Sequence, residues 1–231
     1  MSGVPALELE RLSVAYGRIT VVREIDLEVP ASGVVCLLGR NGAGKTTLLK
    51  AVMGLLPRTG TVRIDGRDST GWSGARVNRA GVAWVPQESG VFPGITVAEH
   101  LHVATRFDRA GLDREVLDLF PVLEQRSNQH ADTLSGGERK MLGMALAMLS
   151  RPRLILLDEP TEGVAPVIVD ELVDLIKRLS ERCALLLVEQ NLDTALATGD
   201  HCYVLEQGSI VASGDPRTLH RDGELEARLA V

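Results

Sequence analysis

The sequence predicts an α/β fold in which a parallel sheet forms the core, an antiparallel sheet lies against it, and a helical lobe is inserted into that core. Continuous apolar runs at 34–38, 154–157 and 184–188 are typical of parallel strands that are buried on both faces. Runs that alternate apolar and polar residues, at 7–16 and 25–29, indicate half-buried strands. Helix-compatible sequence from 97 to 149 indicates the lobe.

The N-terminal part of the chain supplies the predicted antiparallel sheet and the first core strand. After the two alternating runs, Gly33 breaks the chain and the apolar run 34–38 follows. Residues 60–65 alternate again and end at Asp65-Gly66, a dipeptide typical of hairpin turns. We therefore expect this segment to join the antiparallel sheet.

The remainder of the chain alternates strands and helices. Residues 82–85 are predicted to form a buried strand that ends at Pro86-Gln87, and Pro152 closes the helical lobe. Helical periodicity spans 167–179, between the last two apolar runs. Residues 203–206 and 209–212 are predicted to be strands that Gln207-Gly208 joins as a hairpin. Asp215-Pro216 then supplies an N-cap and a first-position proline, which predict the start of C-terminal helical segments.

Size and composition favour a single domain. With 231 residues, of which 45% are hydrophobic, the chain can bury a full core. We assign residues 1–90 and 151–231 to the core with its antiparallel subdomain, and about 91–150 to the lobe. The sequence has no apolar run near the roughly 18 residues that span a bilayer, and its start, MSGVPALELERL, lacks the features of a signal peptide. These observations predict a cytosolic protein.

Charge and cysteine usage narrow the class of partner. The net charge is −6 and the basic residues are scattered singly, which argues against a surface for nucleic acid, because binding to phosphate backbones needs clustered Lys and Arg. Cys36, Cys183 and Cys202 are odd in number and stand far apart in apolar runs. We expect them to be buried free thiols rather than metal ligands or disulfides.

The most specific motif is GRNGAGKTT at residues 39–47, which fits the pattern G-x-x-x-x-G-K-[S/T]. Glycines let successive backbone N–H groups point toward a triphosphate, Lys45 would neutralise the β and γ oxygens, and the Thr46 hydroxyl would reach Mg²⁺. The motif lies between an apolar run and a predicted helix, the order that it requires. The predicted nucleotide contacts are Gly39, Arg40, Asn41, Gly42, Ala43, Gly44, Lys45, Thr46 and Thr47. By itself the loop fits a kinase, a GTPase, a helicase or a transport ATPase.

Two adjacent acids end the apolar run in LILLDEP. Asp158 and Glu159 follow the run directly, which places them at the carboxyl edge of a parallel sheet, where α/β proteins bind ligands. Asp158 would hold Mg²⁺, and Glu159 would orient or deprotonate the water that attacks the γ-phosphate. The alternative is an acidic junction between a strand and a loop.

A second candidate site for phosphate begins the helix in LSGGERK. Ser135 and Glu138 have the S-x-x-E spacing of a capping box, so a well-capped helix start is the plain interpretation. Gly136 and Gly137 add exposed backbone N–H groups at a helix N-terminus, where anions bind.

Together, GRNGAGKTT, LSGGERK and LILLDEP resemble, in sequence and in order, the phosphate loop, the signature and the acidic strand of ATP-binding cassette (ABC) ATPases. The resemblance covers essentially the whole chain and implies a P-loop NTPase core of the RecA-like type, with ATP and Mg²⁺ as ligands. It also implies that the signature acts in trans. Ser135, Gly136 and Gly137 would then complete the ATP site of a second ATPase subunit, identical or paralogous, in a head-to-tail dimer.

The same resemblance implies roles for two residues outside these motifs. Tyr16 matches the aromatic residue that stacks on adenine, and the alternative is a tyrosine on a sheet surface. Gln87 matches the glutamine that touches Mg²⁺ and the attacking water and that senses the membrane partner. The alternative for Gln87 is a plain polar loop residue.

Two positions depart from the common family pattern. Gln190 stands where many relatives carry a histidine that hydrogen-bonds the γ-phosphate; its amide can donate a hydrogen bond but does not titrate. Ala165 stands where many members have an aspartate that links the two subunits. The strings VEQN and PTEGVAP are similar to those of ATPases that serve importers of branched-chain amino acids or urea.

The resemblance therefore implies an ATPase that drives an importer, with Glu159 as base, Lys45 and Gln190 as γ-phosphate contacts, and permease subunits that dock near residues 88–101. A solute-binding protein would act indirectly, and the chain would lie in the cytoplasm at the inner face of the membrane. Three alternatives remain: an exporter ATPase for lipid or other substrates, for which histidine is expected at position 190; a soluble ABC ATPase serving ribosomes or DNA repair; and a small-molecule kinase.

Overall fold

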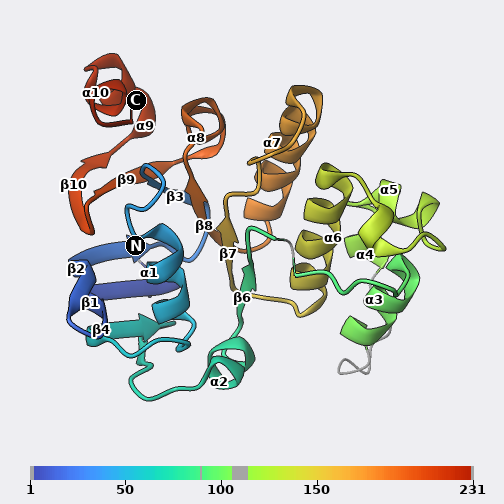
Figure 1. Cartoon of the computed structure of the whole chain (residues 1–231), viewed down its shortest axis with the longest axis horizontal. Coiled ribbons are helices and arrows are strands. Elements are labelled where there is room, and N and C mark those ends of the chain that lie inside the picture. The colour runs from blue at the N-terminus through green and yellow to red at the C-terminus, as the bar shows by residue number, and fades with distance from the viewer. Residues whose placement is uncertain (1–2, 89, 106–113, 230–231) are drawn as a thin grey trace.

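The computed structural model describes residues 3–88, 90–105 and 114–229, and it contains two sheets with a group of helices at one end (Figure 1). The antiparallel sheet has the order β2-β1-β4-β5 and the core sheet has the order β10-β9-β3-β8-β7-β6. The strands are β1 (Leu7–Tyr16), β2 (Ile19–Val29), β3 (Val34–Leu38), β4 (Thr59–Ile64), β5 (Arg67–Asp68), β6 (Val82–Val85), β7 (Leu154–Asp158), β8 (Ala184–Glu189), β9 (His201–Glu206) and β10 (Ser209–Gly214).

The helices fall into two groups. Around the core lie α1 (Lys45–Val52), α2 (Gly74–Arg79), α7 (Pro166–Ser180), α8 (Leu192–Thr198), α9 (Pro216–Arg221) and α10 (Glu224–Leu229). At the end shown on the right of Figure 1 lie α3 (Val97–Thr105), α4 (Arg114–Leu117), α5 (Pro121–Gln125), a 3₁₀ turn (Ala131–Thr133) and α6 (Gly136–Leu149).

The register of the parallel strands brings their carboxyl ends to one level. In the core sheet, β6, β7, β8, β3 and β9 run parallel, and β10 pairs antiparallel with β9. Leu38 at the end of β3 pairs with Glu189 at the end of β8, and Asp158 at the end of β7 pairs with Val188. The loops that follow these strands therefore leave the sheet side by side, as ligand-binding loops of α/β proteins do.

The core sheet is buried on both faces, which explains its continuous apolar strands. On one face, Val35 and Leu37 pack with α1 and with the inner face of the antiparallel sheet. On the other face, Cys36 and Leu38 pack with apolar residues of α6 and α7. The alternation of side chains along β3 thus assigns one core cluster to each face.

The predicted α/β class is confirmed, and most predicted elements are present within a few residues of their expected bounds. The two segments 203–206 and 209–212 form the hairpin β9–β10, and Asp215 caps α9 by accepting a hydrogen bond from the Thr218 N–H at 2.8 Å. The three cysteines are buried free thiols, as predicted. Among the described residues, none of the helices combines the length and apolar character needed to cross a membrane.

Candidate active site

The phosphate loop leaves β3 and enters α1, and glycine is required at two of its positions. Gly44 caps α1 with φ near +109°, a left-handed conformation that residues with a Cβ rarely adopt. At Gly39, a Cβ would lie 2.5 Å from the Leu205 carbonyl oxygen of β9. The loop therefore depends on close packing against β9 as well as on backbone freedom.

Lys45 is the first residue of α1, and its ammonium is held in the loop. It donates hydrogen bonds to the Gly39 carbonyl at 2.6 Å and to the Arg40 carbonyl at 3.1 Å. Its third partner is Glu159, whose Oε1 lies 2.9 Å from Nζ. The lysine side chain is only 4% exposed, so this is a buried ion pair. The two residues that the sequence assigns to phosphate binding and to the general base are thus in direct contact.

Thr46 and Asp158 meet across the space between α1 and β7. The Thr46 hydroxyl donates to Asp158 Oδ1 at 3.2 Å. The second carboxylate oxygen, Oδ2, is buried and has no hydrogen-bond partner. Burial raises the pKa of Asp158 above its usual value. A buried carboxylate oxygen without a partner, beside a hydroxyl, is a donor set that suits a hard cation such as Mg²⁺.

The carboxyl group of Glu162 lies beside that of Glu159, and the sequence motifs did not indicate it. Burial raises the pKa of Glu159, but hydrogen bonding with Glu162 and the Lys45 ammonium outweigh that effect and hold the pKa below its usual value. The same hydrogen bond with Glu159 raises the pKa of Glu162. The Gln87 amide, two residues beyond β6, donates to Glu162 Oε2. Gln87 thus approaches Glu159 through Glu162.

Most of these groups, although not Asp158, line one open pocket of about 490 Å³. The pocket is lined by Tyr16, Val21, Asn41, Gly42, Gly44, Lys45, Thr46, Thr47, Gln87, Glu159 and Glu162. It brings together the phosphate loop, the acidic loop and the segment after β6. Tyr16, at the end of β1, is 48% exposed and contributes an aromatic wall.

The predicted signature lies at the start of α6 and is not part of this lining. Ser135 and Glu138 form the predicted capping box: the Glu138 N–H donates to Ser135 Oγ at 3.2 Å, and the Ser135 N–H donates to Glu138 Oε2 at 2.8 Å. Ser135 is exposed, whereas Gly137 is buried against α7, where a Cβ would lie 2.3 Å from Ile168 Cγ2. Gly137 therefore serves close helix packing, and Gly136 leaves the start of α6 uncovered by a side chain.

Gln190 directly follows β8 and is exposed, beyond the residues that line the pocket. The residue before it, Glu189, is buried and accepts hydrogen bonds from two loops. Its Oε1 accepts from the Thr161 N–H and hydroxyl at 3.1 and 2.8 Å, and its Oε2 accepts from the N–H groups of Gln190 and Asn191. One carboxylate thus fixes the loop after Glu159 to the loop that carries Gln190.

Sequence reasoning missed four groups around the site: Glu162, Glu189, Thr161 and Lys140. Lys140 is buried in α6 and donates to the Glu159 carbonyl at 3.1 Å and to the Gln87 carbonyl. A signal for two of them existed, because Glu162 and Glu189 are acidic residues that stand three residues after Glu159 and directly before Gln190. Nothing in the local sequence indicates that Lys140 reaches across to two other loops.

Comparison with known proteins gives one family and many relatives. Residues 22–162 match the family described as ABC transporter. The chain is 39% identical over 212 residues to the high-affinity branched-chain amino acid transport ATP-binding protein BraG of Pseudomonas aeruginosa, covering 89% of this chain and 91% of the relative. It is 32% identical over 228 residues to the lipopolysaccharide export system ATP-binding protein LptB of Escherichia coli, covering 94% and 93%.

A solved structure has the same fold over nearly the full length. It is described as the structure of an ATP-binding subunit of an ABC transporter and superposes with a TM-score of 0.82 at 26% identity, covering 98% of this chain and 100% of the other. The agreement extends over both sheets and the helical end, not only over the matched family segment.

Proposed function

Because this chain belongs to the ABC transporter family, whose ATP-binding proteins it matches over nearly its whole length, we propose that it is the subunit that hydrolyses ATP to drive a membrane importer. The chain is an ATP-binding ATPase of this family. The observation that carries the proposed mechanism is the buried pair of Lys45 and Glu159 at the pocket. This contact supports the proposal because an ammonium of the kind that binds phosphate lies beside a carboxylate that can accept a proton.

Glu159 is the general base in this proposal. Its carboxylate accepts a proton from the attacking water while the water oxygen forms a bond to the γ-phosphorus, and the bond from that phosphorus to the oxygen bridging to ADP breaks. The lowered pKa of Glu159 keeps the carboxylate ionised at neutral pH. Lys45 stabilises the negative charge of the phosphoryl group, and Gln190 donates a hydrogen bond to it.

Thr46 and Asp158 are proposed to hold Mg²⁺, with Gln87 as a further oxygen donor. The fit rests on the contact between the Thr46 hydroxyl and Asp158 and on the buried Asp158 oxygen that has no partner. When bound, Mg²⁺ would supply charge neutralisation on the phosphate oxygens. Among the described residues, no cluster of three or more His, Cys, Asp or Glu side chains could hold a metal, so the site depends on this mixed donor set.

Tyr16 and the phosphate loop are proposed to bind the rest of the nucleotide. The exposed ring of Tyr16 offers a flat apolar surface on which adenine can stack. The start of α1 would offer its free backbone N–H groups to the phosphates. The lining by Asn41, Gly42, Gly44 and Thr47 supports this placement.

A second ATPase subunit, identical or paralogous, is proposed to complete the site. The start of α6 lies outside the lining of this chain's own pocket, and Ser135 is exposed there. In a head-to-tail dimer, Ser135, Gly136 and Gly137 of each subunit would face the nucleotide of the other. The uncovered backbone at Gly136 can then donate to phosphate, while Gly137 keeps α6 close to α7.

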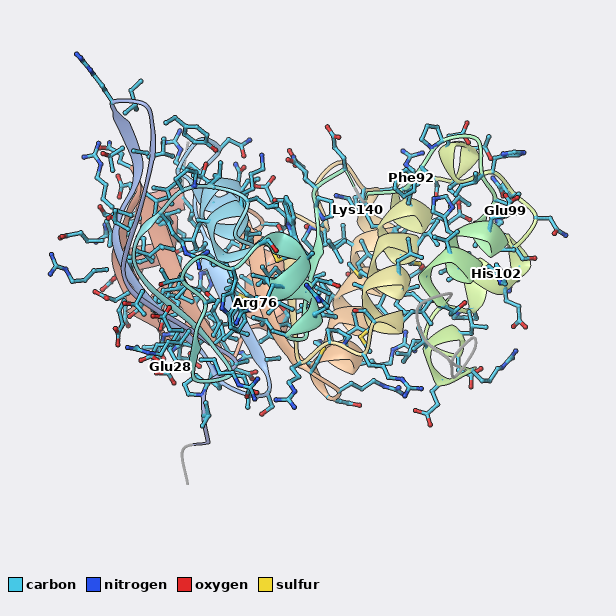
Figure 2. The ribbon with its side chains drawn as sticks, turned by 90° about the horizontal axis from the view of Figure 1, so that it is seen from below. Glu28, Arg76, Phe92, Glu99, His102 and Lys140 are labelled. Carbon is cyan, nitrogen blue, oxygen red and sulfur yellow. The ribbon has the colours of Figure 1, made fainter. Side chains whose placement is uncertain are left out.

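Permease subunits are proposed to hold the chain at the inner face of the membrane, with a solute-binding protein acting indirectly through them. The segment 88–101, of which residue 89 lies outside the described residues, carries an exposed aromatic side chain in Phe92, which is 66% exposed and stacks on His100. Figure 2 labels Phe92 and Lys140, and Lys140 donates to the Gln87 carbonyl. An exposed aromatic side chain five residues beyond Gln87 in the sequence supports docking of a membrane partner at this segment.

Branched-chain or other hydrophobic amino acids are the proposed solutes. The 39% identity to a branched-chain amino acid transport protein exceeds the 32% identity to a lipopolysaccharide export protein. Gln190 also favours the importer, since histidine is expected there in exporters. Urea or a short amide is the alternative solute for the same type of importer.

The proposal is tested by purifying the tagged chain with its membrane partners and reconstituting the complex in liposomes. ATP and Mg²⁺ on the side of the chain should drive uptake of labelled leucine when the solute-binding protein is on the other side, and the Lys45→Ala complex should transport none. Uptake of urea but not leucine would select the alternative solute, and movement of lipid or solute away from the chain's side would overturn the importer.

A further inference from the structure

Lys140 occupies an unusual position for a lysine. Lys140 is a residue of α6, and its side chain is buried. Its ammonium reaches two backbone carbonyls that belong to two other segments. It donates to the Glu159 carbonyl at 3.1 Å and to the Gln87 carbonyl. Lys140, labelled in Figure 2, extends from α6 to the segment that leaves β6. One side chain therefore joins three separate parts of the structure.

The charges around Lys140 explain why it stays buried. Burial lowers its pKa, and four carboxyl groups oppose that effect: Glu162, Glu189, Asp158 and Glu159. They come from the end of β7, the loop that follows it, and the end of β8. A buried cation is costly unless it is hydrogen-bonded and compensated by opposite charge, and this site supplies both.

Lys140 lies close to the start of α6, so its contacts connect the pocket loops to the residues that begin this helix. Ser135 caps α6 five residues before Lys140, and between them Gly137 packs without a side chain against Ile168 of α7. A helix moves as a rigid element over such a short distance. A shift of the Gln87 or Glu159 backbone is therefore transmitted, through the hydrogen bonds of Lys140, to the part of α6 near its start.

We propose that Lys140 is a positioning residue that couples occupancy of the Lys45–Glu159 pocket to the orientation of the α6 start. Lys140 holds two loops that line the pocket: the loop after β6 contributes Gln87, and the loop after β7 contributes Glu159. A phosphate that recruits Lys45 away from Glu159 changes the contacts of Glu159, and Lys140 carries that change to α6. The inference rests on the proposed function, because it assumes that nucleotide fills this pocket and that Ser135 serves a second subunit.

The test measures the distance between the core and the lobe with spin labels. Glu28→Cys on β2 and His102→Cys on α3 place labels at opposite ends of the molecule, and α3 packs against α6 (Figure 2). Both side chains are exposed, and the natural cysteines are buried, so the labels attach at the engineered positions. Distances are recorded without nucleotide and with Mg²⁺ and a non-hydrolysable ATP analogue, and nucleotide affinity is measured on the same samples.

With Lys140 unchanged, the distance should shift on nucleotide binding. Lys140→Met removes the ammonium but keeps an unbranched buried side chain, so it should bind nucleotide with similar affinity, lose the shift, and lose kcat rather than KM. The loss of kcat should fall within the roughly 5- to 150-fold range of typical coupling free energies. Lys140→Arg retains donors for both carbonyls and should restore part of the shift.

Three outcomes overturn the inference. The first is a shift in Lys140→Met equal to that of the parent. The second is a parent that binds nucleotide without any shift; in both of these cases the proposed ATPase function stands. The third is a parent that does not bind nucleotide, which overturns the proposed function as well. Comparison of thermal melting curves for the two Lys140 variants excludes unfolding as the cause, and loss of the shift in a folded Lys140→Met supports the inference.

Discussion

Lys45 Nζ lies 2.9 Å from Glu159 Oε1, so the cation assigned to the γ-phosphate is paired with the carboxylate assigned to the attacking water. Both side chains are buried, and the pair joins the start of α1 to the loop after β7. A phosphate that enters the pocket must share or displace this contact. In the proposed mechanism, the ion pair would therefore link filling of the pocket to release of Glu159, the proposed general base.

The first prediction concerns the stability of this pair without nucleotide. Lys45→Met leaves the Glu159 carboxylate buried without its cation, and breaking a buried ion pair by removing one partner costs roughly 3–5 kcal/mol. The double variant Lys45→Met with Glu159→Gln also removes the unpaired charge, so its unfolding midpoint in urea should be higher than that of Lys45→Met alone. A double variant that is less stable than Lys45→Met would show that the unpaired Glu159 carboxylate does not destabilise the fold.

The second prediction concerns Mg²⁺. Asp158→Asn keeps the size of the side chain and a hydrogen-bond acceptor for Thr46, but it removes the negative charge beside the proposed cation. Titrations with a fluorescent ATP analogue should give weaker binding in EDTA than in Mg²⁺ for the natural chain. Asp158→Asn should reduce that difference and leave binding in EDTA nearly unchanged. An undiminished effect of Mg²⁺ in the variant would remove Asp158 from the proposed donor set.

The third prediction concerns pH. An amide at position 190 does not titrate, so it contributes no limb to the pH profile of kcat, whereas Gln190→His introduces a group with a pKa of about 6.5. Below that pH the imidazole gains a proton and a positive charge, and above it the ring is neutral. The ratio of the two kcat values should therefore change across this region. A ratio that stays constant with pH would indicate that position 190 does not act on the reacting phosphate.

The fourth prediction separates the two roles of Ser135. Asp and Asn both serve as N-caps, so Ser135→Asp and Ser135→Asn should keep α6 stable. Only Ser135→Asp adds a negative charge where the proposed phosphate of a second subunit would lie. Hydrolysis should be lower in Ser135→Asp than in Ser135→Asn, with equal binding of ATP to the chain's own pocket and equal melting temperatures. Equal hydrolysis by the two variants would favour a purely structural cap.

The sequence predicts the core of this structure well, because its signals are local. Continuous apolar runs identified β3, β7 and β8, and the glycines and Lys45 identified the phosphate loop between β3 and α1. Helix α2 was not predicted, since its six residues contain a single buried side chain, Val77, and show too little periodicity to indicate a helix.

The groups that organise the candidate site were harder to predict, for a physical reason. Lys140 bonds to backbone carbonyls 53 and 19 residues away in the chain, and Glu189 bonds to Thr161 across 28 residues. A backbone carbonyl carries no sequence signature, so no local pattern marks such partners. Glu162 could have been found, because it lies three residues beyond Glu159 in the same acidic loop.

The most direct test of the account is a comparison of ATP binding and ATP hydrolysis by the natural chain and Glu159→Gln in the presence of Mg²⁺. Glutamine cannot accept the proton and no longer pairs with Lys45 as an ion, so the variant should bind ATP at least as tightly as the natural chain. Its hydrolysis should be slower by about 10²-fold or more, the range typical of general-base catalysis, and its ATP-bound form should accumulate as a dimer. Glu159→Gln that turns over ATP at the natural rate would contradict the account.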